Sequence, residues 1–172
     1  MRLTAHYFCL PMDLIEKMET CEETRKEWTH EPWELDSRDL WIHWDALHYF
    51  LCGTQQVTDD PLSWAFKGGK ELDTPDFGYG PMRVLSHEQL CQVHAALQDV
   101  DVESLAAKWD YQVLIDKGIY PDFLWKHATD EDPRKYIEDD FHKLTSYFEA
   151  AANFKGLADR GNLGMLLWIR AT

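Results

Sequence analysis

The sequence predicts an α+β fold, in which a small sheet is covered by about five helices in a single compact domain. Strand-like apolar segments lie at the two ends of the chain and once near its middle, and the segments between them carry apolar residues at helical spacing. The chain has 172 residues, 45% of them hydrophobic, which suits one domain over residues 1–172 with a well-filled core.

The predicted sheet joins the two ends of the chain. Residues 2–10 and 163–169 are rich in aliphatic and aromatic side chains, as strands are. Residues 82–85 add a short strand from the middle of the chain. Because strands and helices do not alternate one by one, the pattern favours α+β over a doubly wound parallel sheet.

The densest apolar and aromatic segment, residues 39–53, predicts a central helix. We expect Asp36 or Ser37 to cap its N-terminus and Asp39 to lie in its first turn. Gly53 is expected just past its end, in the left-handed conformation. Apolar residues surround nearly the whole helix, which indicates that other elements cover most of its sides.

Further helices follow from capping residues and periodic apolar stripes. Asp60 is the expected cap of a short helix, Ser86 opens a capping box with Gln89, and Asp101 caps the next helix. The expected helices span residues 11–18, 60–67, 86–97, 101–118 and 132–154. Residues 22–35 are interpreted as a charged connector and residues 119–125 as an extended apolar connector.

The chain is strongly acidic, with 31 Asp and Glu against 17 Lys and Arg and a net charge of −14. This charge is repelled by phosphate backbones and anionic membranes, so neither nucleic acid nor a membrane is an expected partner. No apolar run approaches the about 20 residues that span a bilayer, and the N-terminus lacks the apolar region of a signal peptide. We expect a soluble, cytoplasmic protein that its charge keeps in solution or directs to a basic protein partner.

No metal or cofactor is expected. The four cysteines are scattered and form no C-x-x-C, so they predict neither a zinc site nor a disulfide framework. His43, Asp45 and His48 do not make a metal site, because the two histidines diverge by about 140° on an ideal helix. The glycines around Tyr79 lack the lysine and serine of a phosphate-binding P-loop. The oligomeric state is left open, since an apolar helix such as the last one could form a dimer face.

One pair in the central helix has catalytic chemistry. Asp45 and His48 are three residues apart and are therefore neighbours on the helix surface. A carboxylate beside an imidazole can raise the imidazole pKa and fix its tautomer, as a general base requires. The alternative is a buried polar pair that ties the helix to a loop by hydrogen bonds.

Aromatic and polar residues outside that pair are candidates for a binding surface. Trp28 and Trp33 stand in the polar segment 22–35, where each could anchor a partner or fold back to cap the core. The loop 77–81 could form a pocket wall beside the central helix. The candidate binding residues are Trp28, Trp33, Trp41, Trp44, Ser63 and Tyr79.

An ordered set of short motifs resembles the YfbM-like family of bacterial domains of unknown function. The motifs are Trp44-Asp-Ala-Leu-His48 with Leu51-Cys-Gly53, Asp60-Pro-Leu-Ser63 with Ala65 and Gly68-Gly69, Gly78-Tyr-Gly-Pro81 with Arg83, Leu85 and Ser86, and Ile119-Tyr-Pro121 with Tyr147-Phe-Glu-Ala-Ala151. They span most of the chain, from about residue 2 to residue 170. The charged segment 22–35 and Cys52 depart from the family pattern. The resemblance implies a compact α+β domain and no particular activity.

Two functions of different classes follow. The first is a non-enzymatic binding module, such as an immunity-type antidote to a basic toxin, for which the net charge and the two connector tryptophans argue. The alternative is a small-molecule-binding protein or a hydrolase-like enzyme with a pocket around Asp45 and His48. In that pocket Asp45 would orient His48 as the general base, and Ser63 or Tyr79 would contact the ligand.

Overall fold

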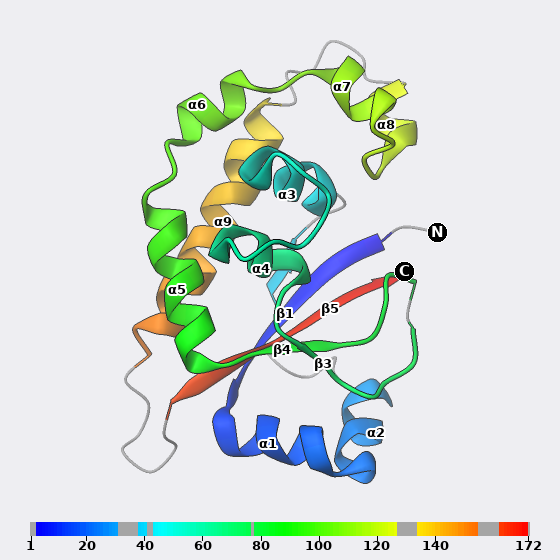
Figure 1. The fold of residues 1–172 in the computed structure, drawn as a ribbon, viewed down its shortest axis with the longest axis vertical. Helices are drawn as coiled ribbons and strands as arrows, with labels where there is room; N and C mark the ends of the chain where they lie inside the picture. Colours follow the sequence, from blue (N-terminus) through cyan, green and yellow to red (C-terminus); the bar gives the residue numbers. More distant parts are fainter. Residues whose placement is uncertain are drawn as a thin grey trace.

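The computed structural model describes residues 3–30, 38–40, 43–76, 78–126, 134–154 and 162–171. One antiparallel sheet carries helices on both of its faces (Figure 1), so the α+β prediction is confirmed. The predicted caps Asp36 and Ser37 lie outside the described residues.

The sheet has five strands in the order β2-β1-β5-β4-β3, and every neighbouring pair is antiparallel. The strands are β1 (Leu3–Pro11), β2 (Arg38–Leu40), β3 (Lys70–Glu71), β4 (Arg83–Leu85) and β5 (Leu163–Ala171). The two terminal strands and the middle strand were predicted, whereas the short edge strands β2 and β3 were not.

The central pair of strands, β1 and β5, is buried on both faces. The strands pair over nine residues each, with Tyr7 opposite Leu167 and Phe8 opposite Leu166. Since successive side chains of a strand point to opposite faces, Tyr7 and Leu167 enter one core while Phe8 and Leu166 enter the other. This explains why the end of the chain is almost continuously apolar rather than alternating.

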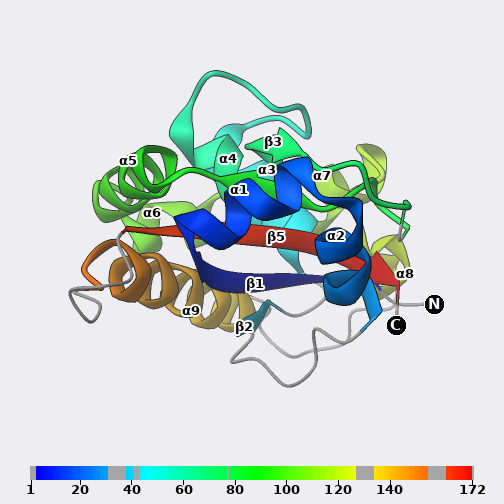
Figure 2. The same ribbon diagram turned by 90° about the horizontal axis from the view of Figure 1, so that it is seen from below.

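Helices divide between the two faces of the sheet (Figures 1 and 2). The pair α1 (Met12–Thr20) and α2 (Glu22–His30) packs on the face that carries Phe8 and Leu166. The remaining helices lie on the other side, where they enclose the larger core with Tyr7 and Leu167. They are α3 (Trp44–Cys52), α4 (Pro61–Lys67), α5 (His87–Gln98), α6 (Val102–Ala107), α7 (Tyr111–Asp116), α8 (Asp122–Lys126) and α9 (Arg134–Ala152).

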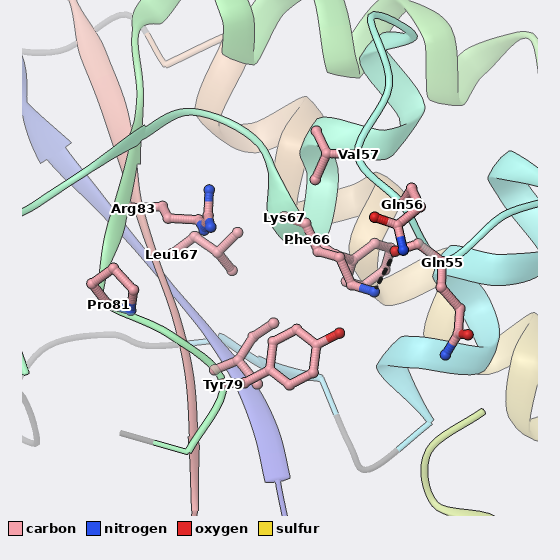
Figure 3. Close-up of a pocket in the computed structure, with 10 residues that line it drawn as sticks. Gln55, Gln56, Val57, Phe66, Lys67, Tyr79, Pro81, Arg83 and Leu167 are labelled. Atoms are coloured by element: carbon pink, nitrogen blue, oxygen red, sulfur yellow. Dashed lines mark hydrogen bonds between the residues drawn. The ribbon is translucent and has the colours of Figure 1, made fainter. Parts of the chain in front are cut away.

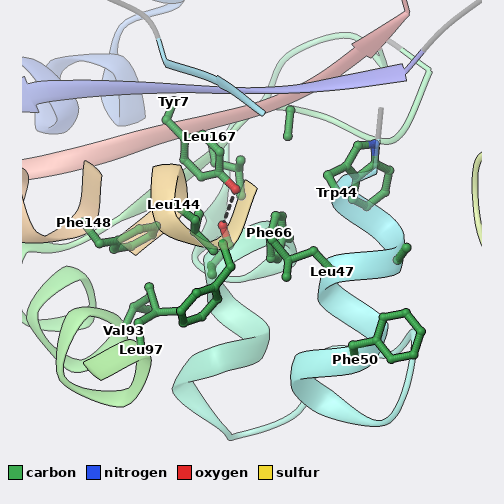
Figure 4. Close-up of a cluster of buried hydrophobic side chains, with 14 of the residues drawn as sticks. Tyr7, Trp44, Leu47, Phe50, Phe66, Val93, Leu97, Leu144, Phe148 and Leu167 are labelled. Atoms are coloured by element: carbon green, nitrogen blue, oxygen red, sulfur yellow. Dashed lines mark hydrogen bonds between the residues drawn. The ribbon is translucent and has the colours of Figure 1, made fainter. Parts of the chain in front are cut away.

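The larger core is closed around Tyr7 (Figure 4). Its ring contacts Phe148 of α9 edge-on, with ring centroids 6.1 Å apart, and its hydroxyl donates a 2.8 Å hydrogen bond to the Ala65 carbonyl. Burial raises the pKa of Tyr7 well above its usual value. The bond ties α4 to the sheet and thereby fixes the position of Lys67 at the end of that helix.

The prediction for the start of the central helix was wrong. Residues 38–40 form strand β2 against β1, with Leu40 opposite Ala5, so Asp39 is not in a helical turn. Helix α3 begins at Trp44, and His43 precedes it without a side-chain capping bond. Strand pairing with the edge of β1 outweighs the local helical signal here. The predicted end is confirmed, because Gly53 follows α3 with φ of 70°.

The structure also breaks the chain into more helices than expected, nine within the described ranges. The segment 22–35 contains α2 rather than only a connector. The single helix expected over residues 101–118 is two, because the Asp110 carboxylate accepts from the Gln112 amide and starts α7 anew. The segment 119–125, expected to be extended, contains the start of α8 after a cis Tyr120–Pro121 peptide.

The predicted caps of three other helices are confirmed. Asp60 accepts a 2.9 Å hydrogen bond from the Leu62 amide at α4, and Asp101 accepts from the Glu103 amide at α6. Ser86 forms the expected capping box of α5. These local signals act independently of the fold, which is why the sequence alone located them.

Candidate functional site

Asp45 lies in the first turn of α3, and its carboxylate accepts hydrogen bonds from three donors elsewhere in the chain. Oδ1 accepts a 2.9 Å bond from Nζ of Lys67. Oδ2 accepts from the Tyr120 amide at 3.1 Å and from Nε2 of Gln55 at 3.3 Å. Asp45 therefore joins α3 to α4, to the loop after α3 and to the segment before α8, and none of these three hydrogen bonds involves His48.

Lys67 closes α4 and is buried, although it is the last residue of its helix. Its ammonium donates to Asp45 and also to the Gln55 carbonyl at 2.9 Å. The same nitrogen lies 5.4 Å from the ring centroid of Trp44 and 5.2 Å from that of Tyr79. A carboxylate, a carbonyl and two aromatic faces thus offset the cost of removing this charge from water.

Tyr79 lies on a tight turn between two glycines, Gly78 and Gly80, with φ of 119° and 87°. The Asp76 carboxylate accepts hydrogen bonds from both glycine amides, at 2.7 and 2.9 Å, and these bonds lower the pKa of Asp76. The turn holds the Tyr79 ring edge-on against Trp44, with centroids 4.8 Å apart. Only glycine adopts such φ values without strain, so the turn sets the place of this side chain.

A cavity of about 370 Å³ opens beside the Lys67 group. Figure 3 shows Arg83 reaching in from β4, with Lys67, Gln55 and Gln56 on the opposite side and Tyr79 along one wall. The lining residues are Gln55, Gln56, Val57, Phe66, Lys67, Tyr79, Pro81, Arg83, Leu167 and Ile169. The cavity therefore combines apolar walls with side chains that donate hydrogen bonds.

Two cations line this cavity, and each already has a carboxylate partner. Lys67 is paired with the buried Asp45, whereas Arg83 is paired with Glu71 of the edge strand β3, which lies directly opposite it in the ladder. The side chains of Arg83 and Glu71 are 26% and 55% exposed. Val57 and Tyr79, at 47% and 39%, are exposed large hydrophobic residues that share this cavity.

His48 does not form the predicted accessible base. The residue is fully buried, its ring meets Phe66 edge-on at 5.9 Å, and its Nδ1 lies 3.8 Å from Sγ of Cys52. Burial and then the positive charge of Lys67 lower the pKa of His48 to about 4, against the opposing effect of Asp45. The expected rise in pKa is thus reversed, because desolvation outweighs the carboxylate that Lys67 already neutralises.

The predicted binding residues fall in different places. Trp28 is partly buried in α2 and packs edge-on against Phe8, with ring centroids 6.2 Å apart, which is the core-capping alternative. Trp44 is buried in the larger core. Ser63 is buried and donates to the carbonyls of Thr58 and Asp60, so it closes a turn rather than lining the cavity. Tyr79 does line it, whereas Trp33 and Trp41 lie outside the described residues.

The sequence did not single out Lys67, Gln55 or Arg83. A lysine in the last turn of a helix ordinarily interacts with the dipole at the surface, so nothing in its spacing predicts burial. The one available signal is that Lys67 ends the apolar run Trp64-Ala-Phe66. Its partner Asp45 comes from a different helix, and their meeting depends on how α3 and α4 pack.

Within the parts of the chain that the structure describes, no three His, Cys, Asp or Glu residues come close enough to hold a metal ion. None of the helices in these ranges combines the length and the apolar character that crossing a bilayer requires.

The fold and the cavity together define an α+β protein with a small polar pocket beside a buried ion pair. Residues 1–156 match the model of a domain of unknown function, DUF1877, and the chain belongs to this family. No curated protein matches the chain.

The chain is similar in structure to the protein of unknown function YfbM from Escherichia coli, with a TM-score of 0.69 and 20% sequence identity. The match covers 96% of this chain and 99% of the other. At this identity the likeness concerns the fold. It is consistent with the resemblance that the ordered motifs indicated.

Proposed function

We propose that this protein is a cytoplasmic small-molecule-binding protein whose ligand occupies the cavity between α4, the loop 55–57 and the turn that carries Tyr79. The observation that carries the proposal is the composition of the cavity. Lys67, Arg83 and two glutamine side chains meet apolar groups in a volume of about 370 Å³, which lies within the size range of small-molecule sites.

The side chains that line the cavity are better suited to binding a ligand than to catalysing a reaction. His48 is buried and does not line the cavity, and Asp45 accepts hydrogen bonds from three donors. The accessible cavity groups are a phenol, a guanidinium and amides, which recognise a ligand but do not make an obvious nucleophile and base pair. We therefore favour ligand binding over the hydrolase-like alternative.

A fragment screen tests the proposal. Ligand-observed NMR on the full chain should find fragments whose binding is lost in Tyr79→Ala and weakened in Val57→Ser, because both side chains line the cavity. Phe154→Ser, which changes an exposed aromatic residue outside the cavity, is the matched control and should keep the same hits. Fragments that bind all variants equally, or an absence of hits, would reject the proposal.

A basic protein partner is a second candidate, favoured by the net charge of −14. Three exposed acids, Glu22, Glu23 and Glu27, lie on α2. Capture of one basic protein at low salt, its loss at high salt and its loss from a variant with these three acids changed to Gln would support this candidate. Capture that is insensitive to salt would count against an electrostatic interface.

A further inference from the structure

The two cations that line the cavity, Lys67 and Arg83, differ in how easily their carboxylate partners can be exchanged. The Asp45 carboxylate is buried and accepts hydrogen bonds from Lys67, Gln55 and the Tyr120 amide. Its displacement would leave the buried Lys67 ammonium without a carboxylate partner. The Glu71 carboxylate, in contrast, is more than half exposed and accepts a hydrogen bond from the Arg83 guanidinium. An exposed pair of this kind contributes little to stability.

We infer that the ligand of this cavity carries a carboxylate, which replaces the Glu71 carboxylate on the Arg83 guanidinium; the inference rests on the proposed ligand-binding function. Arg83 is the only lining residue in the described ranges whose positive charge has an exchangeable partner. Exchange of one carboxylate for another keeps the charge of Arg83 balanced, and Glu71 can turn into solvent from its position on the two-residue edge strand.

The guanidinium is suited to this exchange. Its planar fork has five N–H donors and can hold a carboxylate through two parallel hydrogen bonds, which a single lysine cannot do. Glu71 lies opposite Arg83 in the β3–β4 ladder, so the chain already places a carboxylate on this guanidinium, and a ligand carboxylate in the cavity would compete with it.

The charge of the protein favours a singly charged acid over a phosphate. A phosphate would bring close to two negative charges into a chain whose net charge is already −14, whereas a carboxylate brings one. The rest of the ligand faces apolar walls formed by Val57, Pro81, Leu167 and Ile169. A short acid with a small aromatic or aliphatic body therefore suits a cavity that has a guanidinium on one wall and these apolar groups beside it.

Matched probes test the inference directly. Benzoate, 3-phenylpropanoate and hexanoate are titrated into the 15N-labelled full chain alongside their neutral amides, and affinity is read from backbone chemical shifts around the cavity. We expect each acid to bind a few-fold more tightly than its amide, because the charge-assisted pair gained on the guanidinium is offset in part by the Glu71 pair that is lost.

Variants distinguish the contribution of the ligand carboxylate from that of the competing Glu71 carboxylate. Arg83→Gln should bring the acid down to the affinity of its amide, and Arg83→Lys should keep part of the preference, because the charge remains while the fork is lost. Glu71→Gln should tighten acid binding several-fold, because the internal competitor is gone. Glu19→Gln, which removes a nearby negative charge from the Lys70 pair instead, is the matched control and should leave the acid affinity close to that of the wild type.

The outcomes distinguish this inference from the function on which it rests. Equal binding of acids and amides at the cavity would overturn the inference and leave the ligand-binding proposal standing. Acid binding that Arg83→Gln and Glu71→Gln do not change would also overturn it. If no acid and no amide binds the cavity at millimolar concentrations, the inference and the ligand-binding proposal are both rejected.

Discussion

The ammonium of Lys67 lies 2.9 Å from Oδ1 of Asp45, with the two residues only 6% and 2% exposed. The pair joins the last residue of α4 to the first turn of α3. Both helices form part of the larger core, and Lys67 also reaches the cavity wall. A single buried contact therefore couples the packing of two helices to the shape of the candidate ligand site.

Breaking this pair from one side should destabilise the protein strongly. Asp45→Asn leaves the Lys67 charge buried without its carboxylate, and Lys67→Met leaves Asp45 in the same position, so each should lower the free energy of unfolding by about 3–5 kcal/mol. The double variant should recover a large part of the loss, because no unpaired charge remains. Urea denaturation followed by tryptophan fluorescence measures all three.

The exposed pair of Lys126 and Asp122 on α8 provides the control for the buried one. Both side chains are 51% exposed and the contact is 2.7 Å, so the geometry is similar while the burial is not. Lys126→Met should change the free energy of unfolding by less than about 1 kcal/mol. Single buried variants that are as mild as this control would show that the Lys67 charge is solvated in solution.

The stability of the protein should fall on acidification below pH 6.5 because of His48. Its folded-state pKa is lowered from 6.5 to about 4, so between these values the unfolded chain binds the proton and the folded chain does not. The free energy of unfolding therefore rises with pH through this window, by up to roughly 3 kcal/mol, and this contribution is lost as the pH falls to 4.

Chemical denaturation at several pH values between 7 and 4 measures this effect. His48→Leu, which removes the titrating group from an apolar setting, should flatten the pH profile relative to the wild type. His142→Gln, at an exposed position on α9, should leave the profile as it is. A profile that His48→Leu leaves as steep as before would assign the acid sensitivity to other groups.

Trp28 should behave as a packing residue of α2. Its ring contacts Phe8 in the smaller core, so Trp28→Ala should cost about 2 kcal/mol of unfolding free energy, less than for a fully buried tryptophan. Phe154→Ala, at an exposed aromatic residue, should cost less than about 0.5 kcal/mol. If Trp28→Ala is as neutral as this control, the tryptophan is free to act as a partner anchor after all.

The capping box at the start of α5 should be worth about 1 kcal/mol. The Ser86 hydroxyl oxygen accepts from the Gln89 amide at 3.2 Å, and the Gln89 side-chain oxygen accepts from the Ser86 amide at 3.0 Å, so Ser86→Ala leaves a helix-end donor unsatisfied. Ser146→Ala, at an exposed position inside α9, replaces serine by a better helix former and should be neutral or slightly stabilising. Equal effects of the two changes in thermal unfolding would contradict a capping role.

Local chemistry made part of the fold predictable. The caps at Asp60, Ser86 and Asp101 and the end of α3 at Gly53 depend on residues within a few positions of one another, and the structure has all four. The terminal strands could be predicted from the sequence because both of their faces are buried, which makes them apolar over most of their length. The start of α3 was not predictable in this way, because residues 38–40 pair with β1, a partner more than 30 positions away.

The sequence by itself therefore determined the α+β class, the terminal strands, the caps of α4, α5 and α6 and the end of α3, since hydrophobic periodicity and capping act over short distances. Only the tertiary structure decided the candidate site. It brought Asp45 to Lys67 rather than to His48, buried His48 against Phe66, and placed Arg83 beside Glu71 at the cavity. These outcomes depend on which helix faces and strand edges meet, and a buried charge is only favourable once its partner from a distant segment has arrived.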